Sequence, residues 1–298
     1  MDRALIIDGH AYAYRAFHAI RRLNSPDGRP TNAIFGFVKM LSKMRGSLAP
    51  SHLAVVWDGG LSAARMAALP EYKAQRPEMP EDLATQLDEI VAYLNAAGIC
   101  SICEDGVEAD DYIAALAKQL AGRGLNVVIA SSDKDFFQLV SPRVGLLNPN
   151  DKSEVVWTAE QVRAKTGVGP EQVVDWLSLI GDTVDNIPGV PGVGPKTATE
   201  LLGRFGSVES LYARLDEVQS ERLRAALRAA AEDVKRNREL IRLQDDLPAI
   251  AEAGDLVVKR ADTVRLRELF GRWGFRSLAA ELNAAEGGQT DLFAGPAN

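Results

Sequence analysis

Nine acidic residues stand in short clusters along this 298-residue sequence, with no histidine or cysteine among them. They are Asp8, Asp58, Glu108, Asp110, Asp111, Asp133, Asp135, Asp182 and Asp185. Carboxylate oxygens are hard ligands that select Mg²⁺, with Mn²⁺ as a substitute, over Zn²⁺. Nine carboxylates suffice for two ions, and two ions about 3.5–4 Å apart are a common arrangement for hydrolysing phosphodiester bonds. The clusters therefore predict a two-Mg²⁺ site.

Predicted β-strands place four of these acids. Asp8 follows Ala4–Ile7, Asp58 follows Leu53–Trp57, and Asp133 and Asp135 follow Val127–Ala130. Ligands bind beyond the carboxyl ends of the strands in open α/β sheets, so we expect these side chains to meet at one edge. A single Asp after a strand is often only a helix cap, but the repetition favours a shared site.

The other acids lie at a predicted helix start and before a turn. Glu108, Asp110 and Asp111 open a helix, where the helix dipole explains some acidic charge but not three acids that repel one another. Residues 108 and 111 share a face and 110 points roughly 100° away, so the three can line a cavity from two sides. Asp182 and Asp185 would face one ion if their segment is helical.

A Gly/Pro-rich hairpin follows Asp185. Gly189 and Gly194 have the spacing of a nucleotide-binding phosphate loop, but Pro195 occupies the position that needs lysine, which excludes that motif. Glycine permits close backbone approach, and Pro195 can begin a helix whose N–H groups face a phosphate. The segment predicts a helix–hairpin–helix element that binds duplex DNA without reading its sequence, and its carbonyls could hold a monovalent cation.

Two further segments are basic. The stretch 61–80 is long for a connection between a strand and a helix, and it carries Arg65, Lys73 and Arg76. It is either an ordinary surface loop or a basic arch that holds the scissile phosphate. The stretch 222–242 is rich in arginine and is either a solvated helix face or a surface that follows phosphates.

Bulk composition is compatible with a nucleic-acid partner. The formal net charge is -7, but setting the nine clustered acids aside leaves 32 acids against 34 bases. No apolar run reaches the ~18 residues of a membrane span, and the N-terminus lacks a signal-peptide core, so we expect an intracellular, cytoplasmic protein without membrane contact. Cys100 and Cys103 have no second pair, which favours core packing in a buried strand at Ile99–Cys103 over a metal site.

Strands and helices alternate to about residue 158, which predicts an α/β fold with a mostly parallel central sheet flanked by helices. Helices are expected at Asp82–Ala97 and Asp110–Leu120, and edge strands at Val144–Leu147 and Val155–Trp157. Later helices are expected at Pro170–Leu179, Thr197–Phe205, Val208–Arg214 and Glu221–Leu243. We therefore expect an α/β nuclease domain at 1–158, a helical DNA-binding region at 159–283 with its hairpin at 186–199, packed on the first, and a flexible tail at 284–298.

Six ordered motifs resemble the 5′-nuclease domain at the N-terminus of bacterial DNA polymerase I, a member of the flap endonuclease family. They are LIIDGHAYAYRAFHAI, VVWDGG, EYKAQRPEMPEDL, EADDYIAALA, ASSDKDFFQLV and GDTVDNIPGVPGVGPKTA. The resemblance covers roughly residues 3–280. It implies a structure-specific 5′→3′ exonuclease and flap endonuclease, Mg²⁺-dependent, that acts in replication and repair on DNA with a 5′ flap, nick or 5′ end.

The resemblance also implies roles for individual residues. Asp8, Asp58 and Asp110 would lie nearest the first metal, Asp133, Asp135, Asp182 and Asp185 around the second, and Glu108 and Asp111 between or behind. Lys73 and Arg76 would polarise the scissile phosphate beside Asp8 and Asp110. Tyr14 would stack on the terminal base, Arg15 and Arg65 would contact DNA, and Gly192, Gly194, Lys196 and Thr197 would bind the downstream duplex, with K⁺ in the hairpin.

The chain departs from the family at residues 63–68, where an aromatic, an acid and a histidine are replaced by smaller residues around Arg65. This puts the ordering of the arch and its preference for threaded flaps in doubt. Polymerase domains are absent, so the sequence is a free-standing nuclease or part of a longer protein.

The tail contains Gln289, Leu292 and Phe293 in an arrangement that resembles the QxxLF peptide bound by bacterial sliding clamps. The match is either a clamp tether or a coincidence in a linker. Two alternative functions apply to the whole chain: a ribonuclease of the acidic-site PIN type and a non-catalytic structure-specific DNA-binding module. We expect a monomer.

Overall fold

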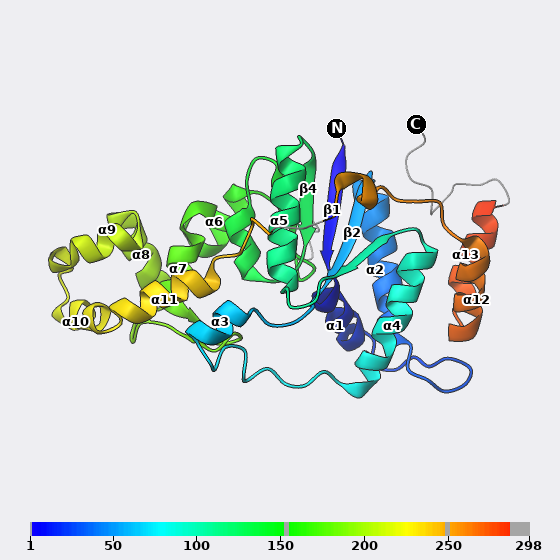
Figure 1. The fold of residues 1–298 in the computed structure, drawn as a ribbon, viewed down its shortest axis with the longest axis horizontal. Coiled ribbons are helices and arrows are strands. Elements are labelled where there is room, and N and C mark those ends of the chain that lie inside the picture. Colours follow the sequence, from blue (N-terminus) through cyan, green and yellow to red (C-terminus); the bar gives the residue numbers. More distant parts are fainter. Residues whose placement is uncertain (1, 152–154, 248–250, 287–298) are drawn as a thin grey trace.

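A six-stranded sheet forms the centre of the computed structural model, which describes residues 2–151, 155–247 and 251–286 (Figure 1). Its strand order is β3-β2-β1-β4-β5-β6. The strands are β1 Arg3–Asp8, β2 His52–Trp57, β3 Cys100–Cys103, β4 Asn126–Ala130, β5 Val144–Leu147 and β6 Val156–Trp157. All neighbours pair in parallel except β5 and β6, so the predicted mostly parallel sheet is confirmed.

The strand β3 differs from expectation. It lies at the edge of the sheet, where it has only one neighbouring strand. Cys100 is half-buried and Cys103 is exposed, and neither forms a disulfide. Cys100 nevertheless packs against the core on one face of the sheet. The prediction of core packing therefore holds in part for Cys100 and is wrong for Cys103.

Helices cover both faces of the sheet, as Figure 1 shows for α5 on one side of β1 and β2 and for α2 and α4 on the other. Alternate residues of β1 enter different cores: Ile6 packs with α5 (Ala109–Gly122), whereas Leu5 packs with α2 (Asn32–Leu48) and α4 (Glu81–Ala96). This two-residue period explains why the strand is apolar throughout. The helix α1 (Gly9–Ala19) begins directly where β1 ends.

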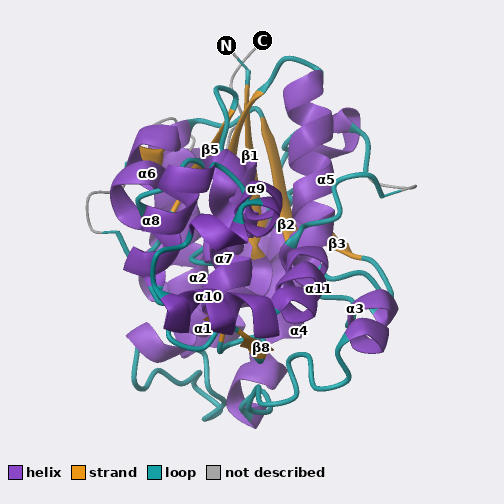
Figure 2. Cartoon of the chain, turned by 90° about the vertical axis from the view of Figure 1, so that its left-hand side faces the viewer, coloured by secondary structure: helices purple, strands orange, loops and turns teal. Residues whose placement is uncertain are grey.

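A helical region extends from the sheet, and Figure 2, viewed from that end, shows its helices in front of the strands. Its helices are α6 Ala159–Thr166, α7 Val173–Ile180, α8 Pro195–Phe205, α9 Val208–Ala213, α10 Glu221–Ala229 and α11 Ala231–Ile241. The single helix expected at Glu221–Leu243 is thus two helices, which meet at Ala230. No glycine or proline marks this break in the sequence.

The last two helices lie elsewhere. The helices α12 (Thr263–Trp273) and α13 (Arg276–Glu286) return to the face of the sheet covered by α2 and α4 (Figure 1). Phe270 lies fully buried beside Tyr93 of α4, with ring centroids 6.2 Å apart. The expected grouping of 159–283 into one helical region therefore does not hold for these helices, because their apolar faces complete the core of the first domain.

Two further expectations concern the C-terminal tail and membrane contact. The flexible tail predicted at 284–298 begins inside α13, which continues to Glu286, so its start is wrong. The rest lies outside the described residues, and with it Gln289, Leu292 and Phe293. Among the helices that are described, none has the length and apolar character required to cross a membrane.

Candidate active site

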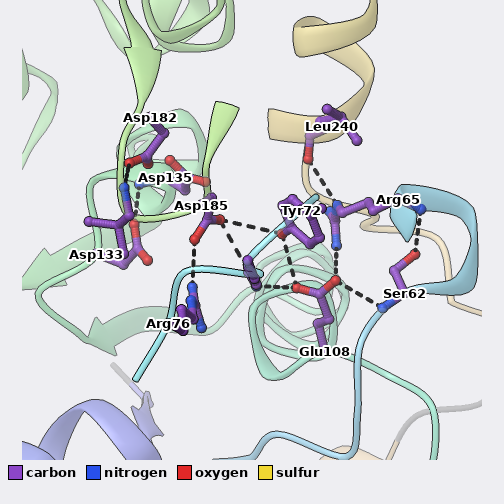
Figure 3. Close-up of polar contacts among 12 residues, drawn as sticks. Ser62, Arg65, Tyr72, Arg76, Glu108, Asp133, Asp135, Asp182, Asp185 and Leu240 are labelled. Carbon is purple, nitrogen blue, oxygen red and sulfur yellow. Dashed lines mark hydrogen bonds and ion pairs between the residues drawn. The ribbon is translucent and has the colours of Figure 1, made fainter. Parts of the chain in front are cut away.

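Three carboxylates lie close enough together to share one cation. One oxygen from each of Asp135, Asp182 and Asp185 lies within 4.8 Å of the other two, and Figure 3 shows the three side chains grouped together. Asp135 begins a short 3₁₀ helix, η1 (Lys134–Leu139). Asp182 ends β7 (Gly181–Asp182), and Asp185 lies in the turn that leads to β8 (Ile187–Pro188). They converge through a β-hairpin, so the helical segment considered in the sequence is not what brings them together.

Glycine makes this hairpin possible. Gly181 has a positive φ of 77°, and a Cβ there would lie 2.4 Å from the backbone nitrogen of Gly189. A Cβ on Gly189 would lie 2.2 Å from the carbonyl oxygen of Ile180. Both contacts are too short for any side chain, so the pair of glycines fixes where Asp182 and Asp185 stand.

The remaining strand-end acids cap local structure with one oxygen each. Asp8 Oδ1 accepts a hydrogen bond from Ala11 N at 3.0 Å, and Asp58 Oδ1 accepts one from Ala109 N at 3.1 Å. Asp133 Oδ1 accepts a hydrogen bond from Asp135 N at 2.9 Å. The capping interpretation and the ligand interpretation are therefore compatible, because each cap orients the carboxylate and leaves its second oxygen for another partner.

Mutual repulsion links these acids into one electrostatic unit. Burial, with added repulsion from Asp133 and Asp58, raises the pKa of Asp8 to about 6. Burial and nearby carboxylates, Asp133 first among them, also raise the pKa values of Asp110 and Asp135 well above the usual range. Asp133 thus acts on carboxylates from both the strand ends and the three-acid group, which places it between them.

The donor set fits a divalent cation. Asp135 Oδ1 is buried and has no hydrogen-bond partner among the described residues. A buried acceptor without a partner is costly, and a cation would satisfy it. A cation would also relieve the repulsion that raises the neighbouring pKa values, and oxygen-only ligands suit Mg²⁺ or Mn²⁺.

Glu108 and Asp111 have different partners from those predicted. Glu108 pairs with Lys73, lies 3.2 Å from Arg65 Nη1, and accepts a hydrogen bond from Ser62 N at 3.0 Å. Although burial acts to raise it, the pKa of Glu108 is held below its ordinary value by Lys73 and Arg65. Asp111 accepts two hydrogen bonds from Arg65 and one from Gln244 N. This placement does not support the prediction that Asp111 is a metal ligand, because protein donors occupy both of its oxygens.

The placement of Arg65 likewise does not support a DNA contact. Arg65 lies in the short helix α3 (Ala63–Ala68) and is only 6% exposed. Beyond Asp111, its Nε donates to Leu240 O at 2.9 Å (Figure 3). Its Nη2 donates to Arg242 O at 3.2 Å. No guanidinium donor is left for a phosphate. The stretch 61–80 is accordingly part helix and firmly attached at this end.

Lys73 and Arg76 lie beside the acidic group, as predicted from their position in the sequence. Lys73 is buried in a left-handed conformation (φ 57°), pairs with Glu108, and donates its backbone N–H to Asp185 O at 3.1 Å. Burial acts to lower the pKa of Lys73, but Asp185 and Glu108 raise it above the ordinary value, so the side chain stays protonated. Arg76 donates to Asp185 Oδ1 at 2.6 Å.

Three further side chains in this site were not predicted from the sequence. The hydroxyl of Tyr72 lies 3.2 Å from Glu108 Oε2 and 3.4 Å from Asp185 Oδ2. Ser131 Oγ donates to Asp8 Oδ2 at 2.8 Å, and Lys134 Nζ lies 3.2 Å from Asp182 Oδ2. The only available signal was adjacency, since each stands within two residues of a predicted site residue.

The predicted DNA-binding hairpin presents open backbone. Gly192 has a φ of 81°, and a Cβ on Gly192 or Gly194 would meet no protein atom within 4 Å. Gly194 caps α8, whose second residue, Lys196, has a side chain that is 91% exposed; Thr197 is half-buried. Trp176 of α7 donates to Pro195 O at 3.2 Å and so holds the two helices of the element together.

The other predicted DNA contacts lie at α1 and α10–α11. The ring of Tyr14 stacks on His18 with centroids 6.3 Å apart, and Arg15 donates to Asn150. In the basic stretch, Arg228 pairs with Asp216, Arg236 with Asp233, and Arg238 with Asp175. For these three arginines the structure favours ion pairing within the protein over a phosphate-following surface.

Sequence comparison covers nearly the whole chain. The family model "5′-3′ exonuclease, N-terminal resolvase-like domain" matches residues 3–167, and "5′-3′ exonuclease, C-terminal SAM fold" matches residues 168–264. A 5′-3′ exonuclease of Aquifex aeolicus is 39% identical over 284 residues, which are 95% of this chain and 96% of that protein. DNA polymerase I of Pseudomonas aeruginosa is 43% identical over 256 residues, which are 86% of this chain but 28% of the polymerase.

Solved structures share the fold. The bacteriophage T5 5′-exonuclease with bound divalent zinc ions aligns with a TM-score of 0.68 at 22% identity, covering 95% of this chain and 98% of that one. The catalytic core of Rad2 in complex with a DNA substrate aligns with a TM-score of 0.65 at 18% identity, covering 95% and 91%. The family models and the relative from Aquifex aeolicus confirm the resemblance seen in the motifs: the chain belongs to the 5′-3′ exonuclease family, whose members are nucleases that act on DNA.

Proposed function

We propose that this protein is a structure-specific 5′→3′ exonuclease and flap endonuclease that hydrolyses DNA with two Mg²⁺ ions, for which Mn²⁺ can substitute. The observation that carries the proposal is the convergence of Asp135, from η1, with Asp182 and Asp185, from the β7–β8 hairpin, in a group where the buried Asp135 Oδ1 lacks a partner among the described residues. We assign Asp133, Asp135, Asp182 and Asp185 to one ion, and Asp8, Asp58 and Asp110 to the other. Bound cations would supply an activated water and stabilise charge on phosphate oxygens.

Lys73 and Arg76 are the residues of this chain that would act on the scissile phosphate. Both are cationic and both stand against Asp185. Lys73 remains charged because Asp185 and Glu108 raise its pKa against the effect of burial. Donors fixed in place before substrate arrives stabilise developing charge without reorganisation. The Tyr72 hydroxyl, between Glu108 and Asp185, holds the same segment in position.

Duplex binding is assigned to the hairpin and to α8. Gly192 and Gly194 face open space, the side chain of Lys196 is exposed, and Thr197 stands beside it in the first turn of α8. The N–H groups at the start of this helix would suit a phosphate backbone. Carbonyls of the same hairpin would hold K⁺. Tyr14 would stack on the terminal base, a contact worth about 1–3 kcal/mol. The protein would then recognise flaps, nicks and 5′ ends by the shape of the DNA. Its place of action would be the bacterial cytoplasm.

Neither alternative function has an observation in its favour. A ribonuclease of the PIN type generally lacks the helical region, which this chain has and which a nuclease family model matches at residues 168–264. A non-catalytic module would be favoured by a missing carboxylate in the acidic group, and none of the predicted acids is missing.

The proposal is tested by incubating the protein with end-labelled 5′-flap, nicked and single-stranded DNA, with Mg²⁺ and with EDTA. We expect cleavage of flap and nicked substrates with Mg²⁺ and none with EDTA. Asp8→Ala and Asp133→Asn should abolish cleavage while DNA binding persists. Normal cleavage by either variant, or undiminished cleavage in EDTA, would overturn the metal assignment.

The tail gives a separate proposal. Gln289, Leu292 and Phe293 would tether a monomeric nuclease to the sliding clamp and raise its local concentration at DNA ends. A pull-down tests this: the double variant Leu292→Ala/Phe293→Ala should lose the clamp. Equal retention by the variant and the unaltered protein would contradict the tether.

A further inference from the structure

One short stretch of the chain contacts three of the segments that surround the acidic group. This stretch, residues 237–244, comprises the last turn of α11 and the residues that follow it, and is called the anchoring segment below. It contains none of the predicted ligands. Its contacts run to the β7–β8 hairpin, to η1, and to the paired elements α3 and α5.

Asn237 attaches the hairpin. Its side chain is fully buried, and its Nδ2 donates to Ser178 O at 3.2 Å and to Pro188 O at 2.6 Å. Ser178 lies in the last turn of α7, just before Asp182, and Pro188 lies three residues after Asp185. One side-chain amide therefore holds both ends of the hairpin that presents two of the three clustered carboxylates.

Gln138 attaches η1. Its Nε2 donates to Asp135 O at 2.9 Å and to Ile241 O at 3.0 Å, and its Oε1 accepts a hydrogen bond from Leu243 N at 3.1 Å. The third carboxylate of the cluster, Asp135, is thus linked through its own backbone to the anchoring segment.

The third attachment is made by Arg65. It donates to Leu240 O and Arg242 O, and at the same time pairs with Asp111 and Glu108 at the start of α5. Gln244 N adds a direct hydrogen bond to Asp111 at 2.9 Å. The last carbonyls of a helix have no partner within it, and here Leu240 O receives its partner from α3 and Ile241 O from η1, which carries Asp135.

We infer that the anchoring segment sets the relative positions of the carboxylates, with Asn237 and Gln138 as positioning residues for metal binding and cleavage. The inference rests on the proposed function. Each attachment joins buried or half-buried groups whose hydrogen bonds are costly to break, so the three segments share one reference point. Removing a residue that orients a metal ligand typically lowers metal affinity or activity by about 10–100-fold.

The test uses Asn237→Leu and Gln138→Met, which keep the approximate volume and remove the hydrogen bonds. Calorimetric titration with Mn²⁺, without DNA, should show binding weakened by about 10-fold or more in each variant, and kcat for flap cleavage should fall by about 10–100-fold. The KM for DNA and the dissociation constant of DNA in EDTA should stay within about 2-fold of the unaltered protein, since neither side chain belongs to the proposed DNA surface. Circular dichroism at the assay temperature confirms that each variant is folded.

Gln172→Met is the matched control. Gln172 is also a half-buried glutamine whose Nε2 donates to two main-chain carbonyls, Leu202 O and Gly206 O, but these carbonyls belong to α8 and its C-cap, which carry none of the predicted ligands. Its variant should bind Mn²⁺ and cleave normally. The inference is overturned if Gln138→Met is folded and unchanged in Mn²⁺ affinity and kcat, or if Gln172→Met loses as much. Absence of Mn²⁺ binding by the unaltered protein would instead overturn the proposed metal site, and this inference with it.

Discussion

The guanidinium of Arg65 forms two hydrogen bonds to the carboxylate of Asp111, at 2.6 and 2.8 Å. Both side chains are buried, and the pair joins α3 to the first turn of α5. An arginine expected at DNA and an acid expected at a metal ion thus satisfy each other. The pair fixes the base of the 61–80 stretch, from which Lys73 and Arg76 reach the acidic group.

Replacing Arg65 should therefore affect stability rather than the electrostatics of DNA binding. Removing one member of a buried ion pair costs about 3–5 kcal/mol, so Arg65→Ala should lower the urea-unfolding free energy by about that amount. Arg65→Lys keeps the charge but not the two-pronged geometry and serves as the milder variant.

The salt dependence of DNA binding separates the two roles. Each phosphate contact contributes about 0.9 to the slope of log K against log salt for duplex DNA. In anisotropy titrations in EDTA, Lys196→Ala should reduce this slope by about that amount, and Arg65→Ala, in conditions where it is folded, should not. Equal reductions in the two variants would return Arg65 to the DNA surface.

Asp135→Asn should abolish cleavage and yet stabilise the metal-free protein. Burial and repulsion from Asp133 raise the pKa of Asp135 well above its usual range, so its ionised form opposes folding near neutral pH. The amide removes that charge, and the melting temperature in EDTA should rise by a few degrees. Asp88→Asn, at an exposed position of α4, should change neither property. A lower melting temperature for Asp135→Asn would contradict the assigned repulsion.

The pKa of Asp8 gives a pH dependence with a definite sign. Its folded-state value is about 6, above the ordinary 3.8, so the folded protein binds more protons than the unfolded chain between these two values. In EDTA the stabilising contribution of Asp8 is complete below the lower value and is lost as pH rises through about 6. A cation must displace the same proton, so Mn²⁺ affinity should increase with pH across that range. Calorimetry on either side of this pKa, in buffers of different ionisation enthalpy, measures the released protons; no release would contradict the shift.

The strand-end carboxylates could be located from sequence because their positions follow from local patterns. An apolar run followed by Asp marks the carboxyl end of a strand in a parallel sheet. Asp8, Asp58 and Asp133 lie at or just after such strand ends. Asp182 and Asp185 were expected to face one ion, but the sequence did not reveal that a hairpin closed by Gly181 and Gly189 would bring them together.

Contacts between distant residues could not be located in this way. Arg65 and Leu240 are 175 positions apart, and no periodicity links them. The helices α12 and α13 were not among those expected, and no local pattern indicates which face of the sheet they cover. Such long-range contacts determine whether Arg65 is exposed to DNA or buried in an ion pair. Without them, its position in a basic loop indicated a DNA contact.

Arg76→Met should separate catalysis from metal binding. Arg76 donates to Asp185 Oδ1, so its removal frees a candidate ligand while removing a donor for the phosphate. We expect kcat to fall by about 100-fold or more, as when one charge-stabilising donor is lost elsewhere. Mn²⁺ affinity should stay the same or increase. Arg163→Met, at an exposed ion pair with Glu171, is the control and should cleave normally. Weaker Mn²⁺ binding by Arg76→Met would show that Arg76 supports the metal site instead.

Gly194→Ala tests whether DNA approaches the start of α8. A Cβ at this position meets no protein atom within 4 Å, and the backbone conformation (φ -101°) is open to alanine. The substitution should therefore cost at most about 1 kcal/mol of stability, through the weaker N-cap preference of alanine. Duplex affinity, measured by anisotropy in EDTA, should nevertheless fall by about 10-fold if a phosphate lies against this backbone, equivalent to about 1.4 kcal/mol.

Gly203→Ala is the matched control, because it adds the same methyl group to the exposed side of the same helix, where space is also open. Alanine within a helix is favoured over glycine by up to about 1 kcal/mol, so this variant should be at least as stable and should bind DNA normally. Equal losses of affinity in the two variants would point to a general change in α8. A loss of DNA affinity confined to Gly194→Ala cannot come from a clash within the protein, because no protein atom lies within 4 Å of the added Cβ. It would therefore indicate that DNA contacts this position.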